Sequence, residues 1–142
     1  MSGASARAAE VVALHHEPLR RWLPEVEAAL VAAGARREVL SQWRRLAGVL
    51  EHHLMKEEVV VFPSLLLLER GLEPSHPGLE RMMAELDREH RDIDRLDATL
   101  RPMLAELGDA GRSGVGVLDD LRVHAAIEEA EIFPVVVRLI GG

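Results

Sequence analysis

One spacing of residues occurs twice in this chain of 142 residues and constrains its fold more than any other feature. The segments His53 to Pro63 (HLMKEEVVVFP) and His124 to Pro134 (HAAIEEAEIFP) share the pattern H-x3-E-E-x3-F-P. On a helix, the histidine and the first glutamate of each copy lie about one turn apart on a single face, where both could reach one metal ion. Another histidine precedes each copy in an apolar setting, His16 in the first half and His90 in the second. The sequence therefore predicts a duplicated pair of helices.

Apolar residues recur at the spacing of one helix face around each of these four histidines. Clusters of glycine and proline separate the four stripes. The four expected helices cover residues 5–33, 37–70, 77–107 and 115–139. Because the connections between them are short, we expect antiparallel neighbours. The predicted fold class is all-α, an up-down-up-down antiparallel four-helix bundle that forms a single domain over residues 1–142.

Five prolines fall inside these helical stripes, namely Pro18, Pro24, Pro63, Pro102 and Pro134. Each removes a backbone hydrogen bond and is expected to bend or end its helix. Pro63 and Pro134 occupy matching places in the two repeats. This match indicates that the two bends belong to the architecture of the bundle.

The composition excludes several kinds of site. The chain has no cysteine, which rules out disulfides, thiolate ligands and iron–sulfur clusters and leaves nitrogen and oxygen ligands for a metal. Its 17 basic and 24 acidic residues give a net charge of -7 without a dense basic cluster, so nucleic acid is not an expected partner. No apolar run is long enough to span a bilayer and no secretory signal is visible, so we expect a cytoplasmic protein without a membrane partner.

Folding the two halves together would bring four imidazoles and two carboxylates into one layer of the bundle. Six side chains exceed the four ligands that a structural zinc ion usually takes, and they suit two metal ions instead. If each ion takes two histidines and one oxygen from each bridging glutamate, Glu57 and Glu128, a shared oxo or hydroxo group supplies a fifth bond. An octahedral ion then keeps one position open for a small molecule.

Mixed imidazole and carboxylate donors favour iron over calcium or magnesium, which prefer oxygen ligands throughout. Manganese and a mixed iron–manganese pair stay open as alternatives. A ferritin-type di-iron centre would instead use the pattern Glu-x-x-His. The single copy of that pattern, Glu73 to His76, lies in a proline-flanked loop and is not expected to bind a metal.

The order of these motifs resembles the hemerythrin HHE cation-binding domain family. The order is a single histidine, then H-x3-E, then a second single histidine, then H-x3-E, with Phe-Pro after each glutamate pair. This pattern covers nearly the whole chain. The resemblance implies a four-helix bundle with two non-heme iron ions, bridged by an oxo or hydroxo group, that handle oxygen, nitric oxide or peroxide. Carried over by position, it implies that the metal ligands are His16, His53, Glu57, His90, His124 and Glu128.

Hemerythrins that carry oxygen have a fifth histidine one turn from the ligand on the third helix. Here the turns on either side of His90 carry Leu86 and Asp94. Without a fifth imidazole one iron ion is more open, so we expect reaction rather than reversible oxygen storage. Asp94 is expected either to be an extra ligand or to orient His90 as a hydrogen-bond acceptor.

Residues beside the predicted ligands leave several choices open. His15 is the alternative ligand to its neighbour on the first helix, whereas His52 falls off its apolar stripe and is expected to face solvent. Glu58 and Glu129 project away from the first glutamate of each repeat, which favours either contact with the ligands or a surface role. Arg20 either meets a carboxylate near the metals or covers the protein surface.

The leading functional hypothesis is a di-iron protein that reacts with small oxidants, with catalase-like removal of hydrogen peroxide under oxidative stress as the candidate activity and an unidentified electron donor as a partner. The alternative is a non-catalytic protein that binds or senses oxygen or nitric oxide and acts through a partner chain. A helical interaction module without metal is the third hypothesis.

Overall fold

The computed structural model describes residues 3–141, which form four helical rods joined by short connections. The first rod consists of α1 (Gly3–Val11), η1 (Val12–His16) and α2 (Glu17–Ala32), and the second of α3 (Arg37–Lys56), η2 (Glu57–Val61) and α4 (Phe62–Glu69). The third rod is α5 (Leu79–Ala105), and the fourth consists of α6 (Gly108–Ile127), η3 (Glu128–Ile132) and α7 (Phe133–Gly141). Each η segment is a short π-helical turn. Residues 3–141 contain no strand, so the predicted all-helical class is confirmed.

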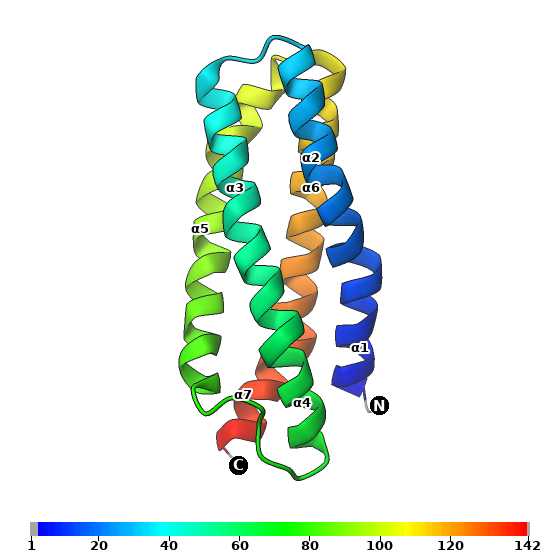
Figure 1. Cartoon of the computed structure of the whole chain (residues 1–142), viewed down its shortest axis with the longest axis vertical. Coiled ribbons are helices and arrows are strands. Elements are labelled where there is room, and N and C mark those ends of the chain that lie inside the picture. The colour runs from blue at the N-terminus through cyan, green and yellow to red at the C-terminus, as the bar shows by residue number, and fades with distance from the viewer. Residues whose placement is uncertain (1–2, 142) are drawn as a thin grey trace.

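Figure 1 shows the path of the chain through these rods. The first rod leads from the N-terminus to the far end of the molecule, where the chain turns into α3, and the second rod returns to the end that holds both termini. After the loop between α4 and α5, the third rod runs away from the termini again and the fourth returns to the C-terminus. The connections therefore lie at the ends of the molecule, and the middle of the bundle is left to side chains from all four rods.

A π-helical turn precedes three of the prolines, namely Pro18, Pro63 and Pro134. Proline has no N–H group and its ring crowds the carbonyl four residues earlier, so an α-helix cannot pass it undistorted. A π turn instead bonds residues five apart, as where Phe62 N–H donates to the carbonyl of Glu57, and equivalent bonds close η1 and η3. Pro24 and Pro102 lie inside α2 and α5. Of the two expected effects, a bend or an end, none of these prolines ends its rod, because all four rods continue past them.

The fourth rod begins at Gly108. The glycine cluster predicts a later start, at residue 115, and that prediction is wrong. Gly108 has a φ of 59°, a left-handed conformation that favours glycine and reverses the chain after α5. Gly111 and Gly114 lie inside α6 and face Leu104 of α5. A Cβ atom on Gly111 would overlap the backbone oxygen of Leu104, and one on Gly114 would lie 2.9 Å from the Leu104 side chain. These glycines permit close helix contact and do not break α6.

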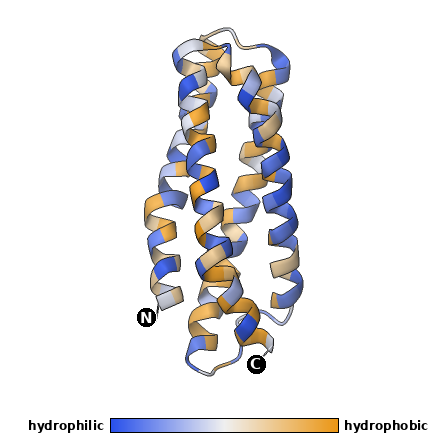
Figure 2. Cartoon of the chain, turned by 180° about the vertical axis from the view of Figure 1, so that it is seen from behind, coloured by the Kyte–Doolittle hydropathy of each residue, from blue (hydrophilic) through white to orange (hydrophobic). Residues whose placement is uncertain are grey.

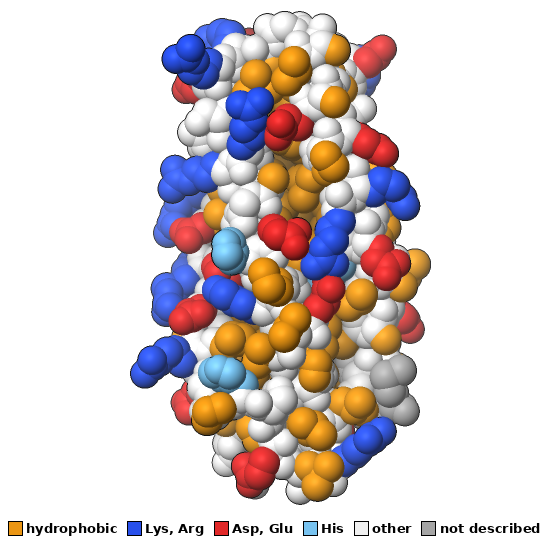
Figure 3. All heavy atoms as spheres, viewed as in Figure 1, with side chains coloured by type: hydrophobic (Ala, Val, Ile, Leu, Met, Phe, Trp, Pro, Cys, Tyr) orange, Lys and Arg blue, Asp and Glu red, His pale blue; other side chains and the backbone are white. Residues whose placement is uncertain are grey.

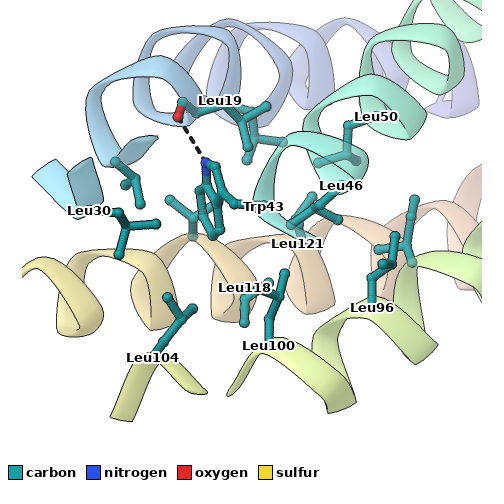
Figure 4. Packing of buried hydrophobic residues seen from close by; sticks show 14 of the residues in the cluster. Leu19, Leu30, Trp43, Leu46, Leu50, Leu96, Leu100, Leu104, Leu118 and Leu121 are labelled. Atoms are coloured by element: carbon teal, nitrogen blue, oxygen red, sulfur yellow. Dashed lines mark hydrogen bonds between the residues drawn. The ribbon is translucent and has the colours of Figure 1, made fainter. Parts of the chain in front are cut away.

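Two apolar clusters fill the bundle on either side of a polar layer. The first, the Trp43 cluster, surrounds an indole whose N–H donates to the backbone carbonyl of Leu23 at 3.0 Å (Figure 4). It draws buried leucines from all four rods, among them Leu19, Leu46, Leu50, Leu96, Leu100, Leu118 and Leu121. The second, the Phe133 cluster, packs α1, α4, α7 and the start of α5 together near the termini. Each buried leucine contributes about 1.5–3 kcal/mol, so the clusters clamp every rod on both sides of the polar layer.

The surface combines charged and apolar side chains. Figure 2 shows that hydrophobic residues are concentrated in α4 and α7, at the end of the bundle that holds the C-terminus. On the face seen in Figure 3, acidic and basic side chains lie beside one another, with apolar side chains between them. Within residues 3–141, none of the helices has both the length and the apolar character needed to cross a membrane.

We expect Gly111→Ala to destabilise the protein by about 1–3 kcal/mol, because the new methyl group would overlap the backbone of Leu104 and push α5 and α6 apart. Urea denaturation followed by far-ultraviolet circular dichroism measures the change in the free energy of unfolding.

Gly116→Ala is the matched control on the same helix, because a Cβ atom there meets no heavy atom within 4 Å. Alanine favours the helix over glycine, so this change should stabilise the protein by about 0.5–1 kcal/mol. The same response from both variants would contradict the close approach of the two helices at Gly111.

Candidate metal centre

Six polar residues meet in the layer between the two apolar clusters, namely His16, His53, Glu57, His90, His124 and Glu128. Each rod supplies one histidine, and the second and fourth rods also supply one glutamate at the start of η2 or η3. All six side chains are buried, with 4% or less of their surface exposed. The structure thus brings together every residue that the sequence pattern singled out as a ligand.

One histidine pair comes from the first and fourth rods. The Nε2 atoms of His16 and His124 lie 2.9 Å apart. Oε1 of Glu57 lies 3.1 Å from Nε2 of His16 and 3.7 Å from Nε2 of His124. Oε2 of Glu128 lies 2.9 Å from Nε2 of His124. We call this group of four residues the His16 position.

The second histidine pair repeats the arrangement with the other oxygen of each glutamate. The Nε2 atoms of His53 and His90 lie 3.1 Å apart. Oε2 of Glu57 lies 3.4 Å from Nε2 of His53, and Oε1 of Glu128 lies 3.1 Å from Nε2 of His90. We call this group the His53 position. In each position the four ligand atoms lie within 4.8 Å of one another, close enough to surround one metal ion, and both glutamates belong to both positions.

The glutamate oxygens have fewer hydrogen bonds than their burial demands. Among residues 3–141, no hydrogen bond of good geometry reaches either oxygen of Glu57 or Oε2 of Glu128. Burial of an ionised carboxylate without such partners costs at least several kcal/mol. A cation held between the histidine pairs would offset this cost. The donor set of imidazole nitrogens and orphaned carboxylate oxygens therefore fits a metal centre.

The glutamates also keep protons on the neighbouring imidazoles. Burial lowers the pKa of His124, but the nearby negative charges of Glu128 and Glu57 outweigh burial and raise this pKa to about 9. Burial likewise lowers the pKa of the other three histidines, and their glutamate neighbours again raise it above the ordinary value. Burial alone raises the pKa of Glu128, but its contacts with Glu57 and His124 hold that pKa well below the ordinary value. The cluster therefore stabilises positive charge at its centre.

The second glutamate of each repeat orients a histidine on the preceding rod. Nδ1 of His16 lies 2.7 Å from Oε2 of Glu58, and Nδ1 of His90 lies 2.9 Å from Oε1 of Glu129. Arg20 donates hydrogen bonds to both oxygens of Glu58, at 3.0 and 2.8 Å. Of the roles left open for these glutamates and for Arg20, the structure shows contact with the cluster. Such contacts fix the ring so that Nε2 faces the centre.

Glu89 and Lys56 also support the cluster, although the repeat does not reveal them. Oε1 of Glu89 lies 3.1 Å from Nδ1 of His53, and Nζ of Lys56 donates to Oε2 of Glu89 at 2.5 Å. The contact crosses from α5 to α3, so the spacing of residues along one helix gives no sign of it. Only the place of Glu89 directly before a predicted ligand could have drawn attention to it.

Three other candidate residues lie outside the cluster. His15, the alternative ligand on the first rod, directs Nδ1 towards Asp120, with 3.2 Å to the nearer carboxylate oxygen. His52 is exposed, as its stripe predicted. Asp94 is exposed and belongs to neither metal position. Glu129, and not Asp94, makes the contact that orients His90.

A cavity of about 10 Å³ borders the His53 position. Its wall consists of Leu50, His53, His90, Ile93, Asp94, Asp97, Leu121, Arg122, His124 and Ala125. A space of this size holds about one water molecule. The room beside the histidines therefore suits a very small ligand.

Comparison with protein-family sequence models finds a match over most of the chain. The hemerythrin HHE cation-binding domain matches residues 7–136, a range that includes all six residues of the cluster. The chain belongs to the hemerythrin HHE cation-binding domain family. Among curated proteins, no sequence matches the chain. Membership of the hemerythrin family implies metal binding, typically of iron, and the buried histidines and glutamates supply candidate ligands.

An ion-pair network ties α5 to α6 beside the hemerythrin-like centre. Asp97, which is 4% exposed, accepts hydrogen bonds from Arg101 at 2.9 Å and from Arg122 at 2.9 and 3.0 Å. Burial raises the pKa of Asp97, but its bonds to the two arginines outweigh burial and lower the pKa below its ordinary value. Ionised Asp97 therefore stabilises the folded chain next to the cavity.

Asp97→Asn should destabilise the protein by about 1–3 kcal/mol at neutral pH, because charge-assisted hydrogen bonds to two arginines are lost. The pKa of Asp97 is lower in the folded than in the unfolded chain, so its contribution is present above the unfolded value of about 3.9 and is lost as the pH falls through the folded value. The difference from the unmodified protein in urea denaturation should therefore shrink in acid.

Asp119→Asn provides the control, because Asp119 also pairs with Arg101 but has 60% of its side chain exposed. It should change the free energy of unfolding by less than about 0.5 kcal/mol. A cost of Asp97→Asn that stayed constant from neutral pH into acid would contradict the role given to its charge.

Proposed function

We propose that the protein is a non-heme di-iron protein that reacts with small oxidants, with hydrogen peroxide as the leading substrate. One observation carries the proposal: each of two buried glutamates offers one oxygen to each of two histidine pairs. Each iron ion would bind two histidines and one oxygen from each of Glu57 and Glu128, and an oxo or hydroxo group would join the ions.

The ligand nitrogens of each histidine pair lie close enough together to bind one metal ion. The Nε2 atoms lie 2.9 Å apart in the His16 position and 3.1 Å apart in the His53 position. With donors of nitrogen and oxygen only, iron is the favoured metal, and manganese is the alternative.

Two iron ions held by the four histidines and two glutamates would supply the two-electron redox chemistry by which two H₂O₂ become two H₂O and one O₂. The protein selects the ligand by size, because the cavity of about 10 Å³ beside the His53 position holds about one water-sized molecule. Leu50 and Ile93 supply apolar surface to the wall of this cavity. The turns beside His90 carry Leu86 and Asp94 in place of a fifth imidazole, which leaves a coordination site for the substrate.

We further propose that residues 1–142 form a single domain with an up-down-up-down antiparallel arrangement. The family match over residues 7–136 and the alternating direction of the rods in Figure 1 support this. The partners in the proposal are the small oxidant and an electron donor from another chain, which would return iron to the ferrous state after oxidation.

Protein produced with iron should contain about two iron ions per chain and absorb light through oxo-bridge charge transfer. His53→Ala and Glu128→Ala should each lose metal, together with the stabilisation of about 3–4 kcal/mol that binding gives when free metal exceeds its Kd by 100-fold to 1,000-fold. Elemental analysis and thermal unfolding with and without a chelator measure both effects.

His52→Ala is the matched control, because His52 adjoins His53 on α3 but is exposed. It should retain the metal and the melting temperature of the unmodified protein. The di-iron proposal fails if the unmodified protein binds no iron and keeps its melting temperature after chelation.

Stopped-flow mixing of the iron-loaded protein with hydrogen peroxide should show repeated turnover with release of oxygen. His52→Ala should keep the rate, and His53→Ala should lose it. Oxidation of the iron that stops after one equivalent of peroxide would rule out catalytic removal of peroxide. A spectral change with oxygen or nitric oxide that reverses when the gas is removed would then support the alternative, a binding or sensing protein that acts through a partner chain.

A further inference from the structure

The two halves of the chain can be compared residue by residue, because His16 matches His90 and His53 matches His124 in the repeated motif order. Some neighbours of these histidines have the same role in both halves. Glu58 contacts Nδ1 of His16, and its counterpart Glu129 contacts Nδ1 of His90. Other neighbours differ between the halves, and these differences give the two metal positions different surroundings.

The first difference lies directly before each single histidine, where the chain has His15 in one half and Glu89 in the other. Glu89 lies 3.1 Å from Nδ1 of His53 and is itself held by Lys56. His15 instead stacks beside the ring of His124, with ring centroids 6.0 Å apart. Among residues 3–141, no acidic side chain makes a hydrogen bond or ion pair with Nδ1 of His124, so this histidine lacks the support that Glu89 gives to His53.

The second difference lies one turn after each single histidine, where Arg20 matches Asp94. Arg20 donates to both oxygens of Glu58 and neutralises much of its charge. Asp94 is acidic and cannot do the same for Glu129. Glu129 has 56% of its side chain exposed, against 24% for Glu58, so solvent screens its charge more strongly. This second difference therefore does not by itself rank the two metal positions.

A carboxylate that accepts a hydrogen bond from one nitrogen of a histidine fixes the ring and makes the other nitrogen a stronger metal donor. Loss of one such contact typically weakens metal binding by about 10-fold to 100-fold. Both histidines of the His53 position have this support, from Glu89 and Glu129. In the His16 position only His16 has it, from Glu58.

We propose that the two metal positions are unequal, that the His53 position binds the first metal ion more tightly, and that Glu89 and Glu129 are the positioning residues responsible. This inference rests on the proposed metal-binding function. It adds an order of loading and assigns the cause to a departure from the internal repeat, Glu89 in place of a second His15.

Titration of the metal-free full chain with Co²⁺, followed by visible absorption, measures the affinities directly. We expect two binding steps whose Kd values differ by about 10-fold to 100-fold. Glu129→Gln and Glu89→Gln should each weaken the tighter step by a similar factor and reduce the separation, whereas Glu58→Gln should weaken only the second step. Glu131→Gln is the control on the same π turn as Glu129, because Glu131 pairs with Arg7 and has 51% of its side chain exposed.

A gain-of-function variant tests the same cause by adding a carboxylate, and the contact of His15 with Asp120 is lost in exchange. His15→Glu gives the first half the residue that Glu89 provides in the second, so it should strengthen the weaker step and bring the two Kd values together. Unchanged affinity of the weaker step in a folded His15→Glu protein would overturn the role given to this position.

The order in which the two positions bind metal can be measured by a signal that a purely structural effect would not change. With one equivalent of Zn²⁺, the ring signals of His53 and His90 in nuclear magnetic resonance spectra should shift before those of His16 and His124. The reverse order, or simultaneous shifts with equal affinities, would overturn the inference while leaving the metal centre in place. Absence of any Co²⁺ or Zn²⁺ binding would instead overturn the proposed function itself.

Discussion

The burial of two carboxylates among four imidazoles is the constraint on which the rest of the structure depends. Glu57 and Glu128 have no exposed surface, and three of their four oxygens lack a well-formed hydrogen bond within residues 3–141. Such a group is tolerated only where the surroundings hold it firmly and a cation can approach. The Trp43 and Phe133 clusters provide that support, because they pack the rods on both sides of the polar layer and leave its side chains little freedom to move apart.

The π turns connect this polar layer to the apolar clusters. η1 ends at His16, and η2 and η3 begin at Glu57 and Glu128, so each turn lies where its rod passes the layer. One extra residue in a turn rotates the following side chains by about 100° around the helix axis. The prolines that follow fix where this happens, since each removes the bond that would restore regular α-helix. The repeated Phe-Pro thus determines the geometry of the site as well as the path of the chain.

The repeated motif accounts for the features that the two candidate metal positions share. Differences between the two halves of the chain account for the features found in only one position. Both halves provide a single histidine, a histidine and a bridging glutamate one turn apart, and a second glutamate that reaches the single histidine. The halves then diverge at His15 and Glu89, which contact the histidines of the second and fourth rods in different ways. Two identical halves would make two identical positions, so any inequality between the metals must come from residues outside the repeat.

The sequence by itself determined the helical class and the inward faces that carry the four histidines and two glutamates, because spacing along one helix decides which side chains share a face. Which side chains meet across helices was decided only by the tertiary structure. Glu89 supports His53 from another rod, and Gly111 allows α6 to pass Leu104, where the same glycines had suggested a loop. Such contacts depend on the rotation and separation of whole rods, which packing of the two clusters sets and which no pattern within one helix records.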